Sequence, residues 1–305
     1  MTVVARSVGL SPDGTQVQRE PYLRSARPED HAGRAPVIVL AAPYSGVGWL
    51  RSLLERDPEL ACTSGTGILP LCEQAMAAWR NADGPAAGSP SALAVTATRA
   101  LASTIITSLL AREGKWRWCE FSVANAQAAE SFLHLYPGTR ILCLHRACPG
   151  VVRATLDASP WGLASAAFAP FTSAYPASTV AALTAYWVAR TGALLAFEQS
   201  HPQACLRVRF EDLAAAEHAT AERISSFLGI VGFECPVEPA GDDQPLRESD
   251  GSGLDTDFPV DLIPSTMLAQ ANDLLQQLGY PTLPAGSARG EPRSAARSAP
   301  LKPCG

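Results

Sequence analysis

The chain has 305 residues, of which 47% are apolar and 17% charged, so it can bury a sizeable core and is not globally disordered. Its length fits one large α/β domain or two small ones. The formal net charge of −5 excludes a broadly basic surface and argues against nucleic acid as the main partner.

Alternating strands and helices are expected along most of the chain. We expect a polar, flexible arm over residues 1–35, one folded domain over 36–280, and a disordered tail over 281–305 that is rich in Pro, Ala, Ser, Gly and Arg. Within the domain, strands are predicted at about 37–41, 115–121, 139–145 and 204–210. Helices are predicted from about residue 48, and at about 69–79, 91–111, 125–134, 148–156, 178–200, 220–228 and 265–278. This order indicates an α/β fold, a three-layer sandwich with a central parallel sheet of four or five strands.

Three further features bear on the compartment and on the substrate. The N-terminal residues lack the apolar run of a signal peptide, and no stretch approaches the roughly 20 apolar residues of a membrane-spanning helix. The eight cysteines are scattered, with no CxxC pair and no Cys/His ligand spacing. We therefore expect a cytoplasmic protein with reduced thiols, no metal site and no membrane partner. A loop over 157–176, rich in Pro and aromatic residues, is a candidate lid over a bulky apolar substrate.

A glycine-containing turn, PYSGVG, follows the first predicted strand and leads into a helix. Such a turn presents backbone N–H groups and the positive end of the helix dipole, which together can hold a phosphate or sulfate group. The turn lacks the GxxxxGK[ST] and GxGxxG patterns of common nucleotide-binding loops. An ordinary tight βα turn is the alternative.

Four segments, in order, resemble elements of the sulfotransferase family that uses 3′-phosphoadenosine 5′-phosphosulfate (PAPS), in its bacterial, small-molecule type. They are PYSGVGWL, YPGTRILCLHRACPGVVRATL, CLRVRFEDLAAAEHATAERISSFLGI and PSTMLAQANDLLQQLGY. The resemblance implies a P-loop-like sulfotransferase fold over about residues 36–280. It also implies PAPS as the donor. The donor-binding positions it implies are Ser45, Gly46, Val47, Gly48, Trp49, Arg51, Arg146, Ala154 and Arg247.

The 5′-phosphosulfate loop is degenerate relative to the family pattern. Tyr44 stands where the family has Lys or Arg, Val47 and Gly48 replace two hydroxyl residues, and Ala154 replaces a serine that binds the 3′-phosphate. A cation at the loop stabilises the charge that develops on the bridging oxygen, and a phenol brings no charge. Arg51, one turn into the helix, is a candidate substitute for the missing cation.

Four residues are candidates for the acid or base that acts on the acceptor: Tyr44, Glu73, Glu120 and His145. Each has a structural alternative. Tyr44 can be a packing substitution, Glu73 a residue on a solvated helix face, Glu120 a partner of a core arginine, and His145 a core histidine beside Arg146.

The function expected from this resemblance is transfer of a sulfuryl group from PAPS to a hydroxyl or amine of a small-molecule natural product, free or carrier-bound. One alternative is an enzyme of the same fold that does not use PAPS and catalyses cyclisation, elimination or acyl chemistry in specialised metabolism. A second is a non-catalytic binding protein. A homodimer is left open.

Overall fold

A computed structural model describes residues 9–10, 16–17, 35–83, 90–123, 126–158, 168–215, 218–230 and 258–284. The chain divides into two units, Met1–Arg34 and Ala35–Gly305. In the first unit, β1 (Gly9–Leu10) pairs antiparallel with β2 (Gln16–Val17). All elements described below belong to the second unit.

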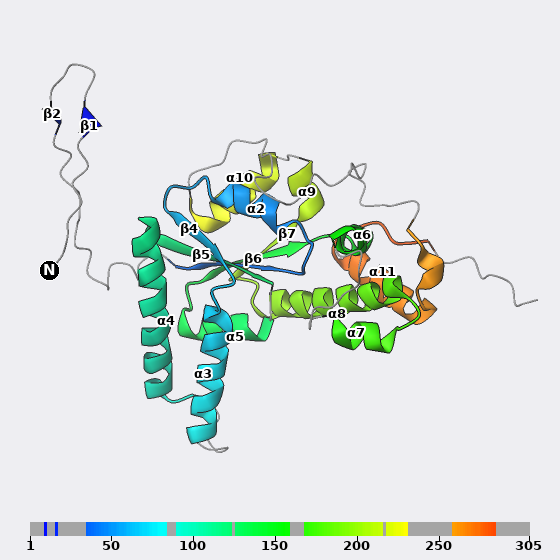
Figure 1. The fold of residues 1–305 in the computed structure, drawn as a ribbon, viewed down its shortest axis with the longest axis horizontal. Helices are drawn as coiled ribbons and strands as arrows, with labels where there is room; N and C mark the ends of the chain where they lie inside the picture. The colour runs from blue at the N-terminus through cyan, green and yellow to red at the C-terminus, as the bar shows by residue number, and fades with distance from the viewer. Residues whose placement is uncertain are drawn as a thin grey trace, which may run out of the picture. The chain divides into compact units, whose positions relative to one another are not determined.

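The second unit is built around a five-stranded sheet in which every neighbouring pair is parallel. Its strands are β3 (Val37–Ala41), β4 (Leu60–Ser64), β5 (Arg117–Val123), β6 (Arg140–His145) and β7 (Cys205–Arg209), in the order β4-β5-β3-β6-β7. All five residues of β3 are buried, as expected for the central strand of a sheet covered on both faces. The predicted α/β fold with a central parallel sheet is confirmed (Figure 1).

Helices cover both faces of the sheet. Apolar residues of one face pack with α2 (Val47–Leu54), α9 (Phe210–Ala214) and α10 (His218–Leu228). Those of the other face pack with α3 (Ile68–Asp83), α4 (Ala92–Glu113), α5 (Ala126–Leu135) and the C-terminal half of α8 (Thr179–Ser200). These helices are the two outer layers of the sandwich. Because the five strands are parallel, the loops that follow them all leave from the same edge of the sheet.

A further apolar cluster lies beyond the carboxyl ends of the strands. It is formed by the N-terminal half of α8 together with α6 (Cys148–Ala158), α7 (Ala169–Ala174), the 3₁₀ turn η1 (Val260–Leu262) and α11 (Ser265–Gln277). Because α8 joins this cluster to the core beneath the sheet, it runs past the edge where the site is expected (Figure 1).

Three expectations from the sequence need correction. Strand β4 was not predicted, because its sequence LACTS is short and only partly apolar. The expected loop 157–176 contains helix α7, while residues 159–167 of that loop lie outside the described residues. Residues 281–284, which were expected to belong to a disordered tail, are described, and Leu283 is 3% exposed with its backbone bonded to the side chain of Asn272; the rest of the expected tail lies outside the described residues.

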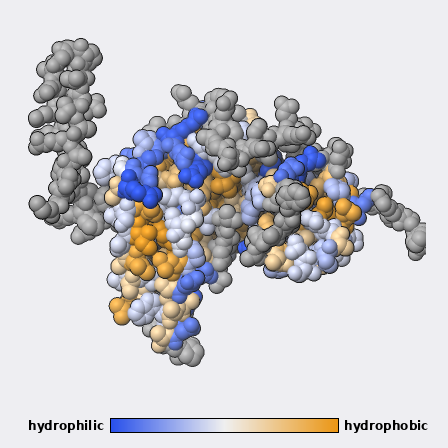
Figure 2. All heavy atoms as spheres, in the orientation of Figure 1, coloured by the Kyte–Doolittle hydropathy of each residue, from blue (hydrophilic) through white to orange (hydrophobic). Residues whose placement is uncertain are grey.

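The expectation that no segment approaches a spanning helix is also wrong. Helices α4 and α8 are long and apolar enough to cross a membrane by length and composition, which by itself is weak evidence. The apolar window of α8 is 61% buried, as in the core helix of a globular domain, whereas that of α4 is 28% buried. Figure 2 shows hydrophobic surface in the region of α3 and α4.

Candidate functional site

The site lies where the chain leaves neighbouring strands in opposite directions. After β3 the chain continues to β4 on one side of the sheet, and after β6 it continues to β7 on the other side. In open parallel sheets, ligands bind outside the carboxyl ends of the strands at such a switch point. The topology therefore brings the turn after β3 beside the residues that follow β6 and β7.

The turn after β3 has the backbone shape of an anion-binding loop. Tyr44 has φ 61° and Gly46 has φ 83°, so the chain twice enters the left-handed region before α2 begins at Val47. The first N–H groups of a helix have no partners within the helix and lie at its positive end. No side chain caps α2, so the start of this helix can receive an anion through its backbone.

Gly46 is required because Phe210, the first residue of α9, packs against it. A Cβ placed on Gly46 would lie 2.0 Å from Cδ2 of the Phe210 ring. The ring of Trp49 meets Phe210 edge-on, with centroids 6.3 Å apart. The two aromatic rings therefore fix the start of α2 against the end of β7.

Arg146, which the resemblance gives as a donor-binding residue, follows β6 and lies at this turn, where its guanidinium is engaged. Its Nη1 donates to the carbonyl oxygen of Tyr44 at 2.9 Å, and its Cζ lies 4.5 Å from the centroid of the Phe210 ring. A Cβ on Gly150 would lie 2.8 Å from its Nε, so the side chain is enclosed on that side too. Arg146 is 7% exposed and braces the turn.

A second set of hydrogen bonds fastens the ends of β6 and β7. Glu211 accepts from the backbone N–H of Ala147 at 2.9 Å and from the hydroxyl of Tyr280 at 2.5 Å. Burial, and then the nearby carboxylate, raise the pKa of Tyr280 far above its usual value, so this phenol stays protonated. These contacts give Glu211 a structural role.

Ser45, Val47 and Gly48 lie within the turn and the first residues of α2; Ser45 is buried at 1% exposure. The guanidinium of Arg51 contacts Glu55, at the end of α2, and residues of β4 rather than the turn. Its Nε donates to Glu55 at 2.7 Å, and its two terminal nitrogens lie 3.4 Å from Ser64 Oγ and from the carbonyl oxygen of Cys62. In the structure, Arg51 therefore joins α2 to the end of β4 and is already paired with a carboxylate.

The 3′-phosphate segment offers fewer ligands than the family pattern. Ala154 lies on α6, and the hydroxyl of neighbouring Thr155 donates to Val151 within the same helix at 2.7 Å. The Thr155 hydroxyl is thus directed into its own helix. Arg247 lies outside the described residues.

His145 is the last residue of β6, is 3% exposed, and forms a cluster with Glu198 and Arg207. Its Nε2 lies 2.5 Å from Oε1 of Glu198 on α8, whose other oxygen accepts from Nε of Arg207 at 2.7 Å. The cluster joins β6, β7 and α8 to one another.

Glu120 is 3% exposed on β5 and is paired with hydroxyl and amide donors. Its Oε2 accepts from Thr63 at 2.6 Å, and its Oε1 accepts from both the N–H and the hydroxyl of Thr66 at 3.0 Å. The expected arginine partner is not among these contacts. Glu73 lies half-buried in the second turn of α3.

Sequence reasoning missed three residues of this region. Phe210 and Glu198 come from parts of the chain far from their partners, so no local pattern points to them. Arg190 on α8 has a signal that was overlooked: it is the single charged residue between Thr179 and Phe197.

Comparison with known proteins identifies the fold family. Residues 36–234 match the sequence profile of the Sulfotransferase family, which covers more than half of the chain. The chain therefore belongs to the sulfotransferase family, as its motifs predicted. A search of curated proteins found no significant match.

Solved sulfotransferases have a similar fold. The sulfotransferase domain from the curacin biosynthetic pathway superposes with a TM-score of 0.53 at 15% identity, covering 82% of this chain and 99% of that chain. The sulfotransferase domain of the Synechococcus PCC 7002 olefin synthase gives 0.49 at 16% identity, with 82% and 97% covered. The sulfotransferase from Alicyclobacillus acidocaldarius gives 0.47 at 12% identity, with 81% and 97% covered.

Proposed function

We propose that this chain transfers a sulfuryl group from PAPS to a hydroxyl or amine of a small-molecule natural product. The observation that carries the proposal is the meeting of the turn after β3 with Arg146, joined by the 2.9 Å hydrogen bond to Tyr44. Family membership and the switch-point position support it.

The residues of the turn fit the phosphosulfate end of PAPS. The backbone N–H groups at the start of α2 would hold its anionic oxygens, and Arg146 adds positive charge beside them. When bound, PAPS supplies an activated sulfuryl group. The fit to the 3′-phosphate is poorer, because Ala154 has no hydroxyl and Arg146 is held by Tyr44 and Phe210.

Of the four candidate acid–base residues, Tyr44 and Glu73 are half-buried and accessible in part. His145 and Glu120 are almost fully buried and hydrogen-bonded within the core, which favours structural roles for both. We infer that Tyr44 or Glu73 acts on the acceptor.

The substrate class rests on analogy. The curacin-pathway domain is named for a natural-product pathway, and the aromatic segment around α7 would cover a bulky, apolar acceptor, free or carrier-bound. A cytoplasmic location, with no membrane or nucleic-acid partner, belongs to the same proposal.

Calorimetric titration with 3′-phosphoadenosine 5′-phosphate (PAP), the nucleotide left after transfer, tests the proposal. We expect micromolar binding, and we expect Tyr44→Lys to tighten PAPS binding about tenfold by adding the cation that the family carries there. Absence of PAP binding at millimolar concentration would remove the sulfuryl-transfer proposal.

Non-binding would favour a second function, a reaction at the same turn that does not use PAPS, such as cyclisation, elimination or acyl chemistry. One observation favours it: the guanidinium of Arg146 already contacts the Tyr44 carbonyl oxygen and the Phe210 ring, which leaves it less able to bind a phosphate. Loss of turnover in Tyr44→Phe without PAP binding would support this alternative.

A further inference from the structure

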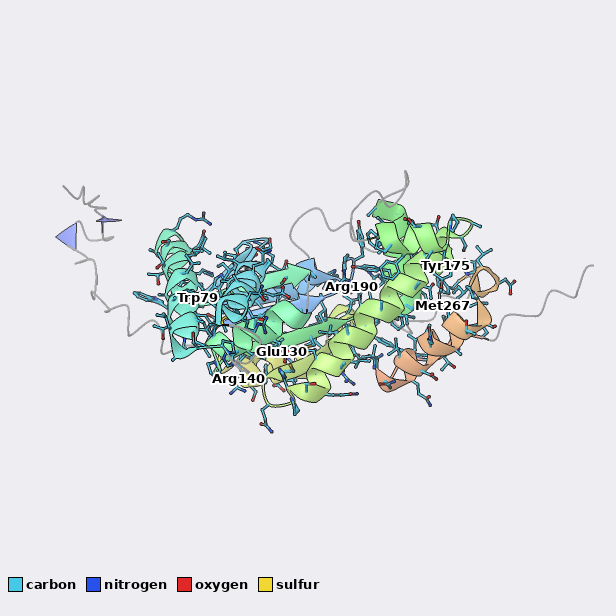
Figure 3. The ribbon with its side chains drawn as sticks, turned by 90° about the horizontal axis from the view of Figure 1, so that it is seen from below. Trp79, Glu130, Arg140, Tyr175, Arg190 and Met267 are labelled. Atoms are coloured by element: carbon cyan, nitrogen blue, oxygen red, sulfur yellow. The ribbon has the colours of Figure 1, made fainter. Side chains whose placement is uncertain are left out.

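A single cation interrupts the uncharged stretch of α8. Arg190 is the one charged residue between Thr179 and Phe197, and it is half-buried. Figure 3 shows Arg190 leaving α8 on the side that faces the strands. A half-buried guanidinium on an apolar helix calls for a partner, because burying a charge without one is costly.

Tyr186, one turn earlier on α8, positions this guanidinium. Cζ of Arg190 lies 5.4 Å from the centroid of the Tyr186 ring. Burial raises the pKa of the Tyr186 phenol, while the charge of Arg190 and a hydrogen bond with it act in the opposite direction. The ring itself is held by Phe168 and Phe171, with centroids 4.5 and 5.3 Å away. Tyr186 is 2% exposed, so it is a rigid support.

No carboxylate pairs with Arg190 in the part of the chain that the structure describes. By contrast, Arg207 on β7 is paired with Glu198. The charge of Arg190 is therefore not neutralised by an acidic residue of the described part of the chain.

The link to the turn runs through Tyr44. Its side chain packs against the apolar cluster that contains Tyr186. The two phenols are close enough that Tyr44 contributes, after burial, to raising the pKa of Tyr186. Tyr186 thus connects Arg190 to the residue that replaces the family's loop cation.

We propose that Arg190 supplies the positive charge that the turn lacks at Tyr44, and that it donates to an anionic oxygen of the donor held at the start of α2. This inference rests on the proposed function. In that reaction the sulfur–oxygen bond to the phosphate breaks, a new bond forms between sulfur and the oxygen or nitrogen of the acceptor, and the acceptor proton leaves to solvent or to an acid–base residue. Arg190 would stabilise the negative charge that remains on the phosphate oxygen.

The first experiment measures anion binding without the nucleotide. Inorganic pyrophosphate is added to wild type, Arg190→Gln, Arg190→Lys and Arg112→Gln, and thermal unfolding is followed. Arg112 is the matched control, since its side chain is 69% exposed on α4. We expect pyrophosphate to raise the Tm of wild type and of Arg112→Gln equally, that of Arg190→Lys by less, and that of Arg190→Gln scarcely at all. Equal stabilisation of wild type and Arg190→Gln, or none in wild type, would overturn the proposal.

The second experiment separates this inference from the proposed function. PAP titration and the slow hydrolysis of PAPS to PAP and sulfate, with water as acceptor, are measured for the same variants and for Arg190→Gln combined with Tyr44→Lys. We expect Arg190→Gln to slow hydrolysis about 100-fold, and the lysine at position 44 to recover most of that loss. If pyrophosphate binding depends on Arg190 but PAP does not bind wild type, the Arg190 site stands and PAPS use fails. If PAP binds and hydrolysis is unchanged in Arg190→Gln, PAPS use stands and the role of Arg190 is refuted.

Discussion

At the scale of single residues, Glu120 shows how a buried carboxylate can serve the fold. Its two oxygens accept three hydrogen bonds from Thr63 and Thr66, and Trp118 donates to the same Thr63 hydroxyl at 2.8 Å. These bonds fix the turn between β4 and α3, where Gly65 and Gly67 both have positive φ. The donors that Glu120 accepts from are hydroxyl and amide groups of Thr63 and Thr66, so its carboxylate stabilises this turn.

We predict that Glu120→Gln lowers the free energy of unfolding by about 2 kcal/mol, because an amide presents a donor where the turn also presents donors. Urea unfolding measures the change. Glu113→Gln, an exposed substitution on α4, is the control and should change stability by less than about 0.5 kcal/mol. If Glu120 were instead the base, Glu120→Gln would abolish turnover and leave stability unchanged.

Cys148 shows how burial links a thiol to pH. It is the first residue of α6 and fully buried, and burial raises the pKa of its thiol to about 12, although a hydrogen bond with Thr184 acts in the opposite direction. In the unfolded chain a thiol loses its proton near pH 8.5. Between these two values deprotonation favours the unfolded state, so this stability is present below about pH 8.5 and declines as pH rises toward 12.

We predict that stability falls less steeply with pH in Cys148→Ala than in wild type. The variant is less stable at pH 7.5 because of the small cavity, but one source of the alkaline decline is gone. Urea unfolding under reducing conditions at pH 7.5, 9 and 10 gives both slopes. Parallel slopes would show that the Cys148 thiol ionises in the folded protein as it does in the unfolded chain.

At the scale of elements, α4 has one buried side and a mostly uncharged exposed side. Leu110 is 6% exposed within the core beneath the sheet, whereas Leu93 and Leu101 are 66% and 47% exposed. The composition of the helix alone resembles that of a spanning segment, but its residues differ sharply in burial. The packing of one side against α3, α5 and the sheet is what holds α4 in place.

A matched pair of substitutions tests this placement. Leu110→Ala should cost about 2–4 kcal/mol, because it leaves a cavity in the core. Leu93→Ala, the same change in the same helix, should stay within about 0.5 kcal/mol, because its side chain is exposed. Denaturant unfolding compares the two. Equal losses would mean that α4 packs with a different side, or that another surface covers Leu93.

Elements with strong patterns were predictable from sequence, and marginal ones were not. Strand β3 spans the predicted residues 37–41, since a continuous run of β-branched residues favours a buried strand. Strand β4 was missed because LACTS gains its strand conformation from pairing with β5, with Cys62 opposite Cys119. Helix α7 was missed within a Pro-containing segment; its Pro170 lies in the first turn, where proline is tolerated.

The site was predictable in its backbone and less so in its side chains. The turn and Arg146 follow from local motifs, and both lie at the carboxyl edge of the sheet. The partners of His145 and Glu120 are 53 to 57 residues away along the chain, so no local pattern indicates them. The engagement of Arg146 with Phe210 is likewise a tertiary contact that only the fold creates.

At the scale of the whole molecule, the contacts divide after Arg34. Strand β3 begins three residues later, and both of its edges are occupied, by β5 and β6. The central strand therefore needs no pairing from the first unit, and the second unit has its own core. Such a unit is expected to fold without the preceding residues.

We predict that deleting residues 1–34 changes the Tm by less than about 2 °C, which corresponds to under about 1 kcal/mol for a domain of this size. Deleting residues 1–41 is the contrasting variant. It removes β3, which separates β5 from β6, and we expect no cooperative unfolding transition by calorimetry. A large loss of Tm in the shorter deletion would show that the first unit contributes to the stability of the second. In that case the deletion would also be expected to weaken anion binding at the turn, because the turn that contains Tyr44 directly follows β3.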